Sequence, residues 1–252
     1  MRSRTLAAAV ACLLLAVAGC MPQQPVAGGG ARQARIIPCR RAMGKIAIDG
    51  KLNDPAWDRA YVLDDFCIPP DGQKPRHPSS AQLLWDDEFL YLGVVMEDFD
   101  LLALKKERDA WLWEDDVVEL FVKPSDVEPA YYEIEINPLG TVLDLLIGRR
   151  LAAGSIDRWK DWDSRIQVAL AVSGTVNNWK DKDKGWIVEA AIPLSAFAPT
   201  PKPQLGDRWR FAVCRYDYSV YLEAGRELTS SARLSVLDFH RFEDYDILEF
   251  AE

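Results

Sequence analysis

Short segments in which apolar and polar residues alternate recur along the chain, and they restrict the fold more than any other feature. A period of two places apolar side chains on one face of a strand. Helical patterns are confined to two short stretches, 54–60 and 194–198. The expected strands are residues 45–48, 80–85, 89–97, 117–123, 131–137, 142–147, 166–172, 186–192 and 209–216. About nine short strands separated by turn sequences predict an all-β fold, an antiparallel β-sandwich of jelly-roll type with short helical turns.

The first 20 residues have the layout of an export signal. Two arginines precede an apolar run at 6–18, which is too short to span a bilayer. The sequence Val-Ala-Gly-Cys at 17–20 resembles the cleavage site of a bacterial lipoprotein. We therefore expect a signal peptide over 1–19 and a lipid on Cys20 that anchors the chain in the cell envelope. Met21 favours the outer membrane over the inner one, and a plain secretory signal is the alternative.

After the signal, residues 20–44 are rich in Pro, Gly and Gln, and we expect them to form a flexible tether. One domain should then occupy 45–252. Removal of the signal and lipidation of Cys20 leave three cysteines, an odd number for an oxidising compartment. Cys39 and Cys67 flank the first structural unit, whereas Cys214 follows an apolar strand pattern. We expect a disulfide between Cys39 and Cys67.

Charge and motif content exclude several classes of function. The 39 acidic residues outnumber the 30 basic ones, for a net charge of -9, which repels a nucleic-acid backbone. The chain has only two histidines and no CxxC, HExxH or GxSxG motif. Two glutamates on one strand project in parallel and would not flank a glycosidic bond. We expect no nucleic-acid partner and no catalytic activity of the chain itself.

Six segments in order resemble the family 9 carbohydrate-binding modules, and the similarity extends from about residue 45 to 250. They include Ile-Asp-Gly-Lys-Leu-Asn-Asp-Pro-Ala-Trp at 48–57 and Trp-Glu-Asp-Asp-Val-Val-Glu-Leu-Phe at 113–121. The others lie at 84–92, 132–140, 185–193 and 239–243. The resemblance implies an antiparallel β-sandwich that binds an oligo- or polysaccharide without catalysis, in support of polysaccharide capture or breakdown. It also implies that calcium could bind near Asp98, Asp100, Asp115 and Asp116.

The resemblance and the chemistry of the residues together suggest a sugar site. Trp113 matches one of two aromatics that enclose the sugar in the family, and Trp111 stands two residues before it. Phe239 or His240 would take the second aromatic position. A flat indole can cover the apolar face of a pyranose while polar neighbours bind its hydroxyl groups. The alternative is that Trp113 belongs to the core.

Four further polar residues complete the predicted site. Glu119 is surrounded by apolar residues, so its charge requires a partner or a ligand. The resemblance implies that it binds sugar hydroxyls, and Arg215, which follows an apolar alternation, is its expected ion-pair partner. Glu133 and Asn137 lie on one face of the strand at 131–137, together with Glu135. That polar face could bind the ligand or simply face solvent.

Two other functions remain open at this stage. The domain could be a structural or partner-binding sandwich that has no sugar ligand. Relatives of the sandwich also bind haem, for which Met43, Met96, His77 and His240 are the candidate axial ligands here. A haem-binding redox module is the less favoured of the two.

Overall fold

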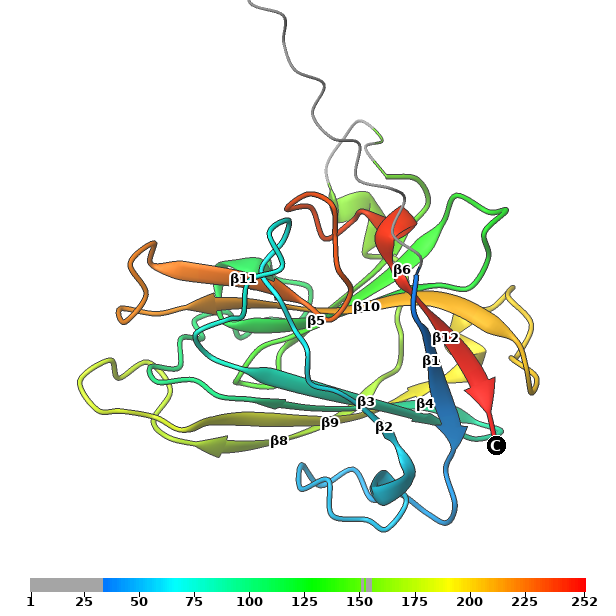
Figure 1. Cartoon of the computed structure of the whole chain (residues 1–252), viewed down its shortest axis with the longest axis horizontal. Coiled ribbons are helices and arrows are strands. Elements are labelled where there is room, and N and C mark those ends of the chain that lie inside the picture. Colours follow the sequence, from blue (N-terminus) through cyan, green and yellow to red (C-terminus); the bar gives the residue numbers. More distant parts are fainter. Residues whose placement is uncertain (1–33, 151, 153–155) are drawn as a thin grey trace, which may run out of the picture. The chain divides into compact units, whose positions relative to one another are not determined.

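The computed structural model describes residues 34–150, 152 and 156–252 (Figure 1). Within these ranges the chain forms twelve strands and five short 3-10 helices, which confirms the all-β prediction. The strands are β1 (Ile36–Arg41), β2 (Tyr61–Leu63), β3 (Ser79–Trp85), β4 (Phe89–Met96), β5 (Val117–Lys123), β6 (Tyr131–Ile136), β7 (Val142–Ile147), β8 (Gln167–Ser173), β9 (Gly185–Pro193), β10 (Arg208–Tyr218), β11 (Arg226–Ser230) and β12 (Asp246–Ala251). The 3-10 helices are η1 (Trp57–Arg59), η2 (Leu112–Glu114), η3 (Ile156–Trp159), η4 (Leu194–Phe197) and η5 (Phe242–Asp244).

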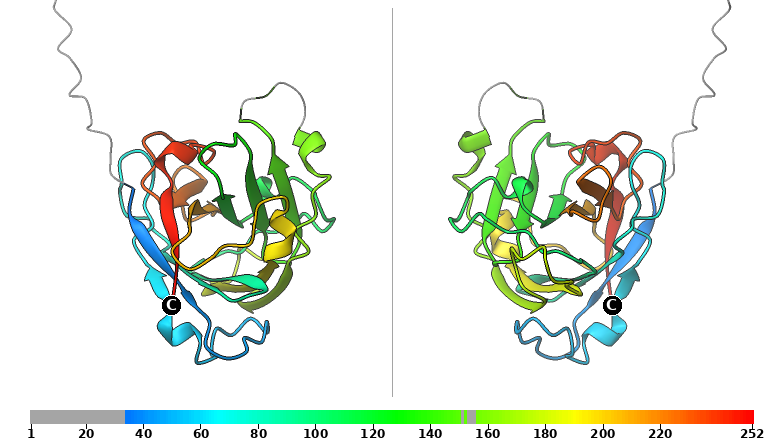
Figure 2. Two further views of the ribbon diagram at one scale, coloured as in Figure 1. Left: turned by 90° about the vertical axis from the view of Figure 1, so that its right-hand side faces the viewer. Right: turned by 90° about the vertical axis from the view of Figure 1, so that its left-hand side faces the viewer.

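The strands form one continuous sheet in the order β7-β6-β5-β10-β12-β1-β3-β4-β9-β8, and β11 and β2 pair with β10 and β3. The sheet is mixed, which differs from the expected antiparallel pairing. β1 runs parallel to both β12 and β3, whereas the other described strand pairs are antiparallel. The parallel pairs arise because β1, from the start of the domain, inserts beside the last strand, as Figure 2 shows.

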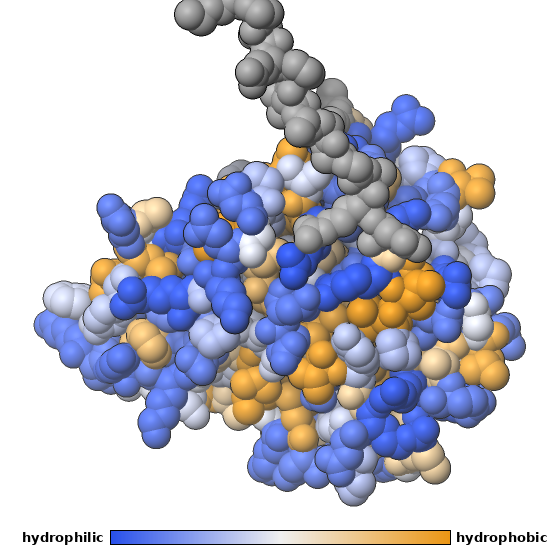
Figure 3. Space-filling model, viewed as in Figure 1, coloured by the Kyte–Doolittle hydropathy of each residue, from blue (hydrophilic) through white to orange (hydrophobic). Residues whose placement is uncertain are grey.

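The sheet curls so that two layers face each other (Figure 1). Strands β3, β4 and β9 form one layer, and β5, β6 and β10 form the other. The main core fills the space between them, with buried side chains such as Leu92 and Val188 from one layer and Leu120, Ile134 and Val213 from the other. The apolar face of each layer is thereby removed from water. The face shown in Figure 3 carries hydrophilic side chains with several apolar patches among them.

The layer of β7, β6, β5 and β10 is also covered on its outer face. A second apolar cluster there joins Phe121 of β5 and Tyr131 of β6 to Leu234, Phe239 and Tyr245 from the segment between β11 and β12. Strand β5 is consequently buried at all seven of its positions. A strand buried on both faces has no polar face that would reveal its orientation in the sequence.

The domain begins earlier than expected. Residues 36–41, placed in the tether by their composition, form β1, in which Ile37 and Cys39 are buried. Residues 45–48 do not form the expected strand; Ile46 and Ile48 instead pack in a small cluster with Trp57. The expected signal peptide, Cys20 and the first part of the expected tether lie outside the described residues. No helix in the described ranges has the length and apolar character needed to cross a membrane.

The first of the resembling segments has a structural role. Glu189, on β9, is completely buried and accepts hydrogen bonds from the backbone N–H groups of Asp49 and Gly50 at 2.9 and 2.8 Å. Its other oxygen accepts the indole N–H of Trp57 at 2.9 Å. Gly50 has a φ of 82° and lies against the Leu170 backbone, where a Cβ atom would come within 2.7 Å. This segment therefore fastens a turn to the sheet and does not line a site.

The expected disulfide between Cys39 and Cys67 is not present, and the structure contains both residues as buried thiols. Cys39 lies in β1 opposite Phe250 of β12. Cys67 instead pairs through its backbone with Ser230, at the end of β11. Flanking one structural unit in the sequence did not bring the two side chains together, because the chain enters different parts of the sheet at these positions. Burial raises the pKa of the Cys39 thiol.

Candidate functional site

A cavity of about 350 Å³ opens on the outer face of β5, β6 and β10. Its volume falls within the usual range for small-molecule sites, roughly 300–1,000 Å³. The three strands supply its floor, and η2 and the segment after β11 supply its walls. We call this cavity the glutamate pocket. It is lined by Trp113, Glu119, Glu133, Glu135, Ile156, Tyr216, Leu228, Leu237, Asp238, Phe239 and His240.

Three carboxylates meet at the floor of the glutamate pocket because of strand register. Glu133 and Glu135 are two residues apart on β6, so their side chains lie on the same face. Glu119 of β5 lies directly opposite Glu135 in the antiparallel pair. The three residues are 2%, 3% and 0% exposed for Glu119, Glu133 and Glu135. One carboxylate oxygen from each lies within 4.8 Å of the others.

These carboxylates lie in an environment that opposes ionisation. Burial, with the negative charge of Glu133, raises the pKa of Glu119 well above its usual range. Burial and the charges of Glu119 and Glu133 raise the pKa of Glu135 in the same way. Burial also raises the pKa of Glu133, although His240 opposes that shift. In the described part of the chain, neither Lys nor Arg forms an ion pair with any of the three.

Aromatic side chains form the walls of the pocket. Trp113 is half-buried, and Trp111 stacks on it with ring centroids 5.5 Å apart and an interplanar angle of 16°. The Tyr218 hydroxyl donates a hydrogen bond to the Trp113 carbonyl at 2.8 Å, which holds η2 against β10. Phe239 is buried and packs edge-on against Tyr216 at 5.3 Å. The pocket thus offers flat apolar surface above a polar floor.

His240 stands at the rim, between the floor and the wall. Its Nδ1 atom lies 2.9 Å from the Tyr131 hydroxyl and 3.8 Å from a Glu133 carboxylate oxygen. The His240 side chain is 39% exposed, so it can also contact a ligand in the pocket.

The structure brings together most of the residues that the sequence singled out. Trp113, Glu119, Glu133, Glu135, Phe239 and His240 all line the glutamate pocket, and Trp111 supports it by stacking on Trp113. Sequence reasoning missed the other lining residues, which include Tyr216 and Asp238. Tyr216 could have been found from strand alternation, because Cys214 and Tyr216 share the face of β10 that adjoins Glu119.

The predicted pairing of Glu119 with Arg215 is wrong. Glu119 lies opposite Cys214, whereas Arg215 lies opposite Val118. Since adjacent residues of a strand point to opposite faces, Arg215 points away from the glutamate pocket and into the space between the layers. The sequence could not place Glu119 on the correct face, because β5 is apolar on both sides.

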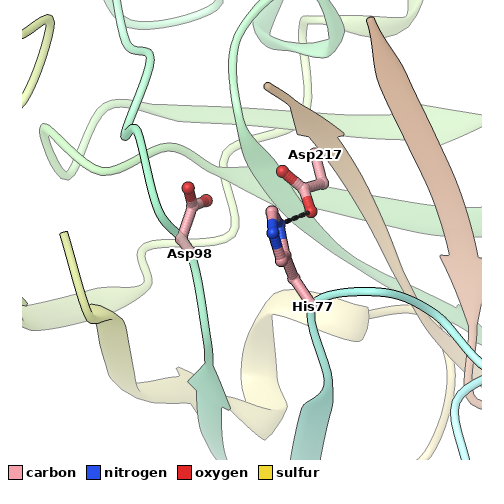
Figure 4. A group of neighbouring side chains, drawn as sticks. All are labelled: His77, Asp98 and Asp217. Carbon is pink, nitrogen blue, oxygen red and sulfur yellow. Dashed lines mark hydrogen bonds and ion pairs between the residues drawn. The ribbon is translucent and has the colours of Figure 1, made fainter. Parts of the chain in front are cut away.

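Arg215 instead belongs to a second buried polar cluster, of which Figure 4 shows His77, Asp98 and Asp217. Its guanidinium donates to Asp98 at 2.8 Å and lies 3.5 Å from Asp217. His77 Nδ1 is 2.7 Å from Asp217 (Figure 4). Burial raises the pKa of Asp98 to about 6, although the Arg215 charge opposes this shift. The guanidinium supplies the positive charge for this cluster, which therefore serves as a structural ion-pair network.

Asn137 does not line the pocket and has a structural role. Its side-chain oxygen accepts the N–H groups of Leu139 and Thr141, both at 3.0 Å, in the turn between β6 and β7. Its NH₂ group donates to Lys105 O and to Asp115 Oδ2. Its hydrogen bonds are thus used within the turn and its neighbours, which explains why alternation with Glu133 and Glu135 did not predict its role.

The aspartates near the loops accept hydrogen bonds from the protein. Asp116 accepts the backbone N–H groups of Leu102 and Tyr218, both at 2.6 Å. Asp100 accepts the N–H of Val220 at 2.7 Å, and Asp115 accepts that of Lys105 at 2.8 Å. These carboxylates tie loops to the sheet.

The candidate haem ligands are distributed across the fold. His77 belongs to the cluster between the layers, whereas His240 lines the glutamate pocket on the outer face of β5, β6 and β10. Met96 is 1% exposed in the core, and Met43 is 65% exposed. The four residues thus lie in different parts of the described structure and do not form a pair of axial ligands for one haem.

A second hollow lies beside the tip of the β10–β11 hairpin and is more apolar. Its volume is about 440 Å³, and its lining includes Leu104, Trp179, Tyr218 and Val220. Trp179 is 61% exposed there. Unlike the glutamate pocket, this hollow is lined by only one acidic residue, Asp100.

Comparison with known proteins gives a consistent result. Residues 48–226, more than two thirds of the chain, match the family described as carbohydrate family 9 binding domain-like. The chain is 24% identical over 168 residues to endo-1,4-beta-xylanase A of Thermotoga maritima, a match that covers 65% of this chain and 13% of the xylanase. The chain thus spans only a small part of that relative.

Solved structures share the fold at low identity. A Bacteroides uniformis protein described as carbohydrate-binding matches with a TM-score of 0.67 and 16% identity, covering 86% of this chain and all of that one. A family 9 carbohydrate-binding module of Caldicellulosiruptor kristjanssonii, solved with cellotriose, matches with a TM-score of 0.58 and 16% identity, covering 86% and 94%. The structure with glucose matches with a TM-score of 0.54 and 17% identity, covering 84% and 95%.

Proposed function

Because the chain belongs to the carbohydrate family 9 binding domain-like family, we propose that it binds carbohydrate without catalysis and that the sugar binds in the glutamate pocket. The observation that carries this assignment is the convergence of Trp113 and Phe239 with three carboxylates around one cavity. Stacking surface and carboxylate acceptors are the two elements that a pyranose requires.

The arrangement suggests how the ligand would lie. Trp113, held in place by Trp111, would cover the apolar face of a sugar ring. Ring-edge hydroxyls would then reach the floor, where Glu119 and Glu133 are hydrogen-bond acceptors, and the rim, where His240 stands. The matched part of the Thermotoga xylanase and the cellotriose held by the Caldicellulosiruptor module favour β-1,4-linked glucans and xylans as the first ligands to test.

The geometry of the carboxylates agrees with binding rather than hydrolysis. Glycosidases place two carboxyl groups on either side of the scissile bond, about 5–9.5 Å apart. Here the three carboxylates are gathered on one floor, with oxygens within 4.8 Å of one another, and they are almost completely buried. A glycosidic bond above this floor would have all three carboxyl groups on one side, so an acid and a base would not flank it.

A glycan array followed by calorimetry tests the function. We expect the purified protein to bind a group of related oligosaccharides and to show saturable binding of the best of them in solution. The oligosaccharide should remain unhydrolysed after prolonged incubation with the protein. The absence of binding to any glycan would favour a structural or partner-binding domain instead.

We further propose that the protein is a lipoprotein of the bacterial cell envelope, more specifically of the outer membrane. The support is the Val-Ala-Gly-Cys sequence at 17–20 after an apolar run, with Met21 next. A lipid anchor and a polar segment would hold the domain at a surface where polysaccharide is captured for breakdown. Both features lie outside the described residues.

Detergent partitioning of the protein made in a bacterial host tests the anchor. We expect the wild-type protein to enter the detergent phase and a Cys20→Ser variant to remain in the aqueous phase, because a lipidated cysteine supplies the membrane affinity. Cys39→Ser, which changes a buried thiol of β1, should partition as the wild type does. Aqueous partitioning of all three proteins would show that the anchor is absent.

A further inference from the structure

We propose that Glu119, Glu133 and Glu135 bind one divalent cation of the Ca²⁺ class at the floor of the glutamate pocket. The proposal starts from a mismatch of charge. Three carboxylates, at most 3% exposed, lie together on the outer face of β5 and β6. A buried carboxylate needs a counter-charge or hydrogen-bond donors, because its desolvation is costly.

The described side chains around the three glutamates do not provide that counter-charge. The charge of Lys160 acts on Glu135, but the Lys160 amino group bonds to the Asp109 carbonyl and pairs with Asp157. The His240 nitrogen that faces Glu133 is 3.8 Å away and also meets the Tyr131 hydroxyl.

The cluster around Arg215 shows what the fold does when it supplies its own cation. There, one possible metal-ligand atom from each of His77, Asp98 and Asp217 lies within 4.8 Å of the others. The Arg215 guanidinium donates a hydrogen bond to Asp98 at 2.8 Å. Glu119, one strand away on the opposite face, has no such arginine. The same layer therefore carries one acidic cluster with an internal cation and one that requires an external cation.

The oxygen atoms of the glutamates are available and suitably spaced. Apart from their contact with each other, both oxygens of Glu135 and one of Glu133 are buried without a hydrogen-bond partner in the described chain, and both residues line the cavity. Calcium binds oxygen ligands at about 2.3–2.6 Å, so two ligands on opposite sides of one ion lie about 5 Å apart. One oxygen from each of the three glutamates lies within 4.8 Å of the other two, which fits this spacing.

The donor set also selects the class of ion. Carboxylate oxygens without thiolates or a well-placed imidazole favour hard cations such as Ca²⁺. Three carboxylates supply three to six of the six to eight oxygens that Ca²⁺ accepts. The remaining positions would face the cavity, where water or, if the proposed function holds, sugar hydroxyls would fill them.

Calorimetric titration of the purified protein with Ca²⁺, after treatment with a chelator and its removal, tests the proposal. We expect one saturable site and weaker binding of Mg²⁺, which retains its water ligands more strongly. Glu135→Gln should weaken Ca²⁺ binding at least tenfold, because one of the three charged ligands is lost. The matched change Glu107→Gln, at an exposed residue, should leave the affinity unchanged.

Thermal unfolding provides a second test, because the substitution should affect the melting temperature differently without Ca²⁺ and with Ca²⁺. Without Ca²⁺, Glu135→Gln should melt at a higher temperature than the wild type, because at neutral pH the wild type must either bury a charge or take up a proton at Glu135 when it folds, whereas Gln is neutral in both states. With saturating Ca²⁺, the wild type should gain more in melting temperature than the variant, because an ion that binds only the folded state stabilises it. Glu119→Gln should behave in the same way if Glu135→Gln fails to fold.

Two results would overturn the cation site. One is no saturable Ca²⁺ binding by the wild type, and the other is wild-type affinity in the Glu135→Gln and Glu119→Gln variants. Sugar binding measured in the presence of a chelator separates this proposal from the function. Sugar binding without Ca²⁺ binding would refute only the cation site, whereas Ca²⁺ binding without any glycan ligand would refute only the sugar site.

Discussion

Replacing Arg215 by Met should lower the free energy of unfolding by about 3–5 kcal/mol, because it leaves Asp98 and Asp217 buried without their cation. Arg215 is 1% exposed, and Asp98 is completely buried. Met can fill much of the same space, so the loss would come from the unpaired charges rather than from a cavity. Urea unfolding at neutral pH, followed by circular dichroism, would measure the difference.

The same strand offers a control. Arg208 at the start of β10 pairs with Glu249, but its side chain is 55% exposed. Arg208→Met should therefore cost no more than about 1 kcal/mol. A similar small loss for Arg215→Met would contradict the structural role given to the network.

The Arg215→Met penalty should also depend on pH. Because burial raises the pKa of Asp98 to about 6, this carboxyl gains a proton as the pH falls through that value. A neutral Asp98 needs no cation, so the penalty should be smaller at pH 5 than at pH 8. The charges of Asp217 and His77 also act on the Asp98 carboxyl and contribute to the size of the change.

Replacing Trp113 by Ala should reduce sugar affinity about 10- to 100-fold, the loss expected when an aromatic stacking surface is removed. Trp113 lines the glutamate pocket and is only half-buried, so the domain should remain folded. Calorimetry with the best ligand from the array gives the affinity, and the melting temperature reports the fold.

Trp179→Ala is the matched control, because Trp179 is 61% exposed and lines the other hollow. Its sugar affinity should equal that of the wild type. If Trp179→Ala loses affinity and Trp113→Ala does not, the sugar binds in the second hollow.

Strand alternation predicted most of the sheet but not its order. Eight of the nine expected segments overlap strands of the structure, from β3 to β10. The strand β1 was missed because Ile37 and Cys39 are its only buried residues and a Pro-, Gly- and Gln-rich segment precedes it. Its pairing with β12 joins the two ends of the domain, and no local pattern encodes such a contact.

The site was predictable where the sequence carried a family pattern or a clear alternation. Trp113 and Glu119 came from the matched segment at 113–121, and Glu133 came from the polar positions of β6. The side of the sheet on which Glu119 lies was not predictable, because β5 is buried on both faces. Arg215 was consequently assigned to the wrong cluster. For the same reason, the sequence did not predict that three glutamates meet without a basic side chain beside them.

A crystal structure of the protein with the best oligosaccharide from the array tests the central claim most directly. We predict a sugar ring against Trp113 in the glutamate pocket, with hydroxyl groups directed toward Glu119, Glu133 and Glu135, either directly or through a bound cation. A sugar located beside Trp179 and Val220, with an empty glutamate pocket, would contradict the account.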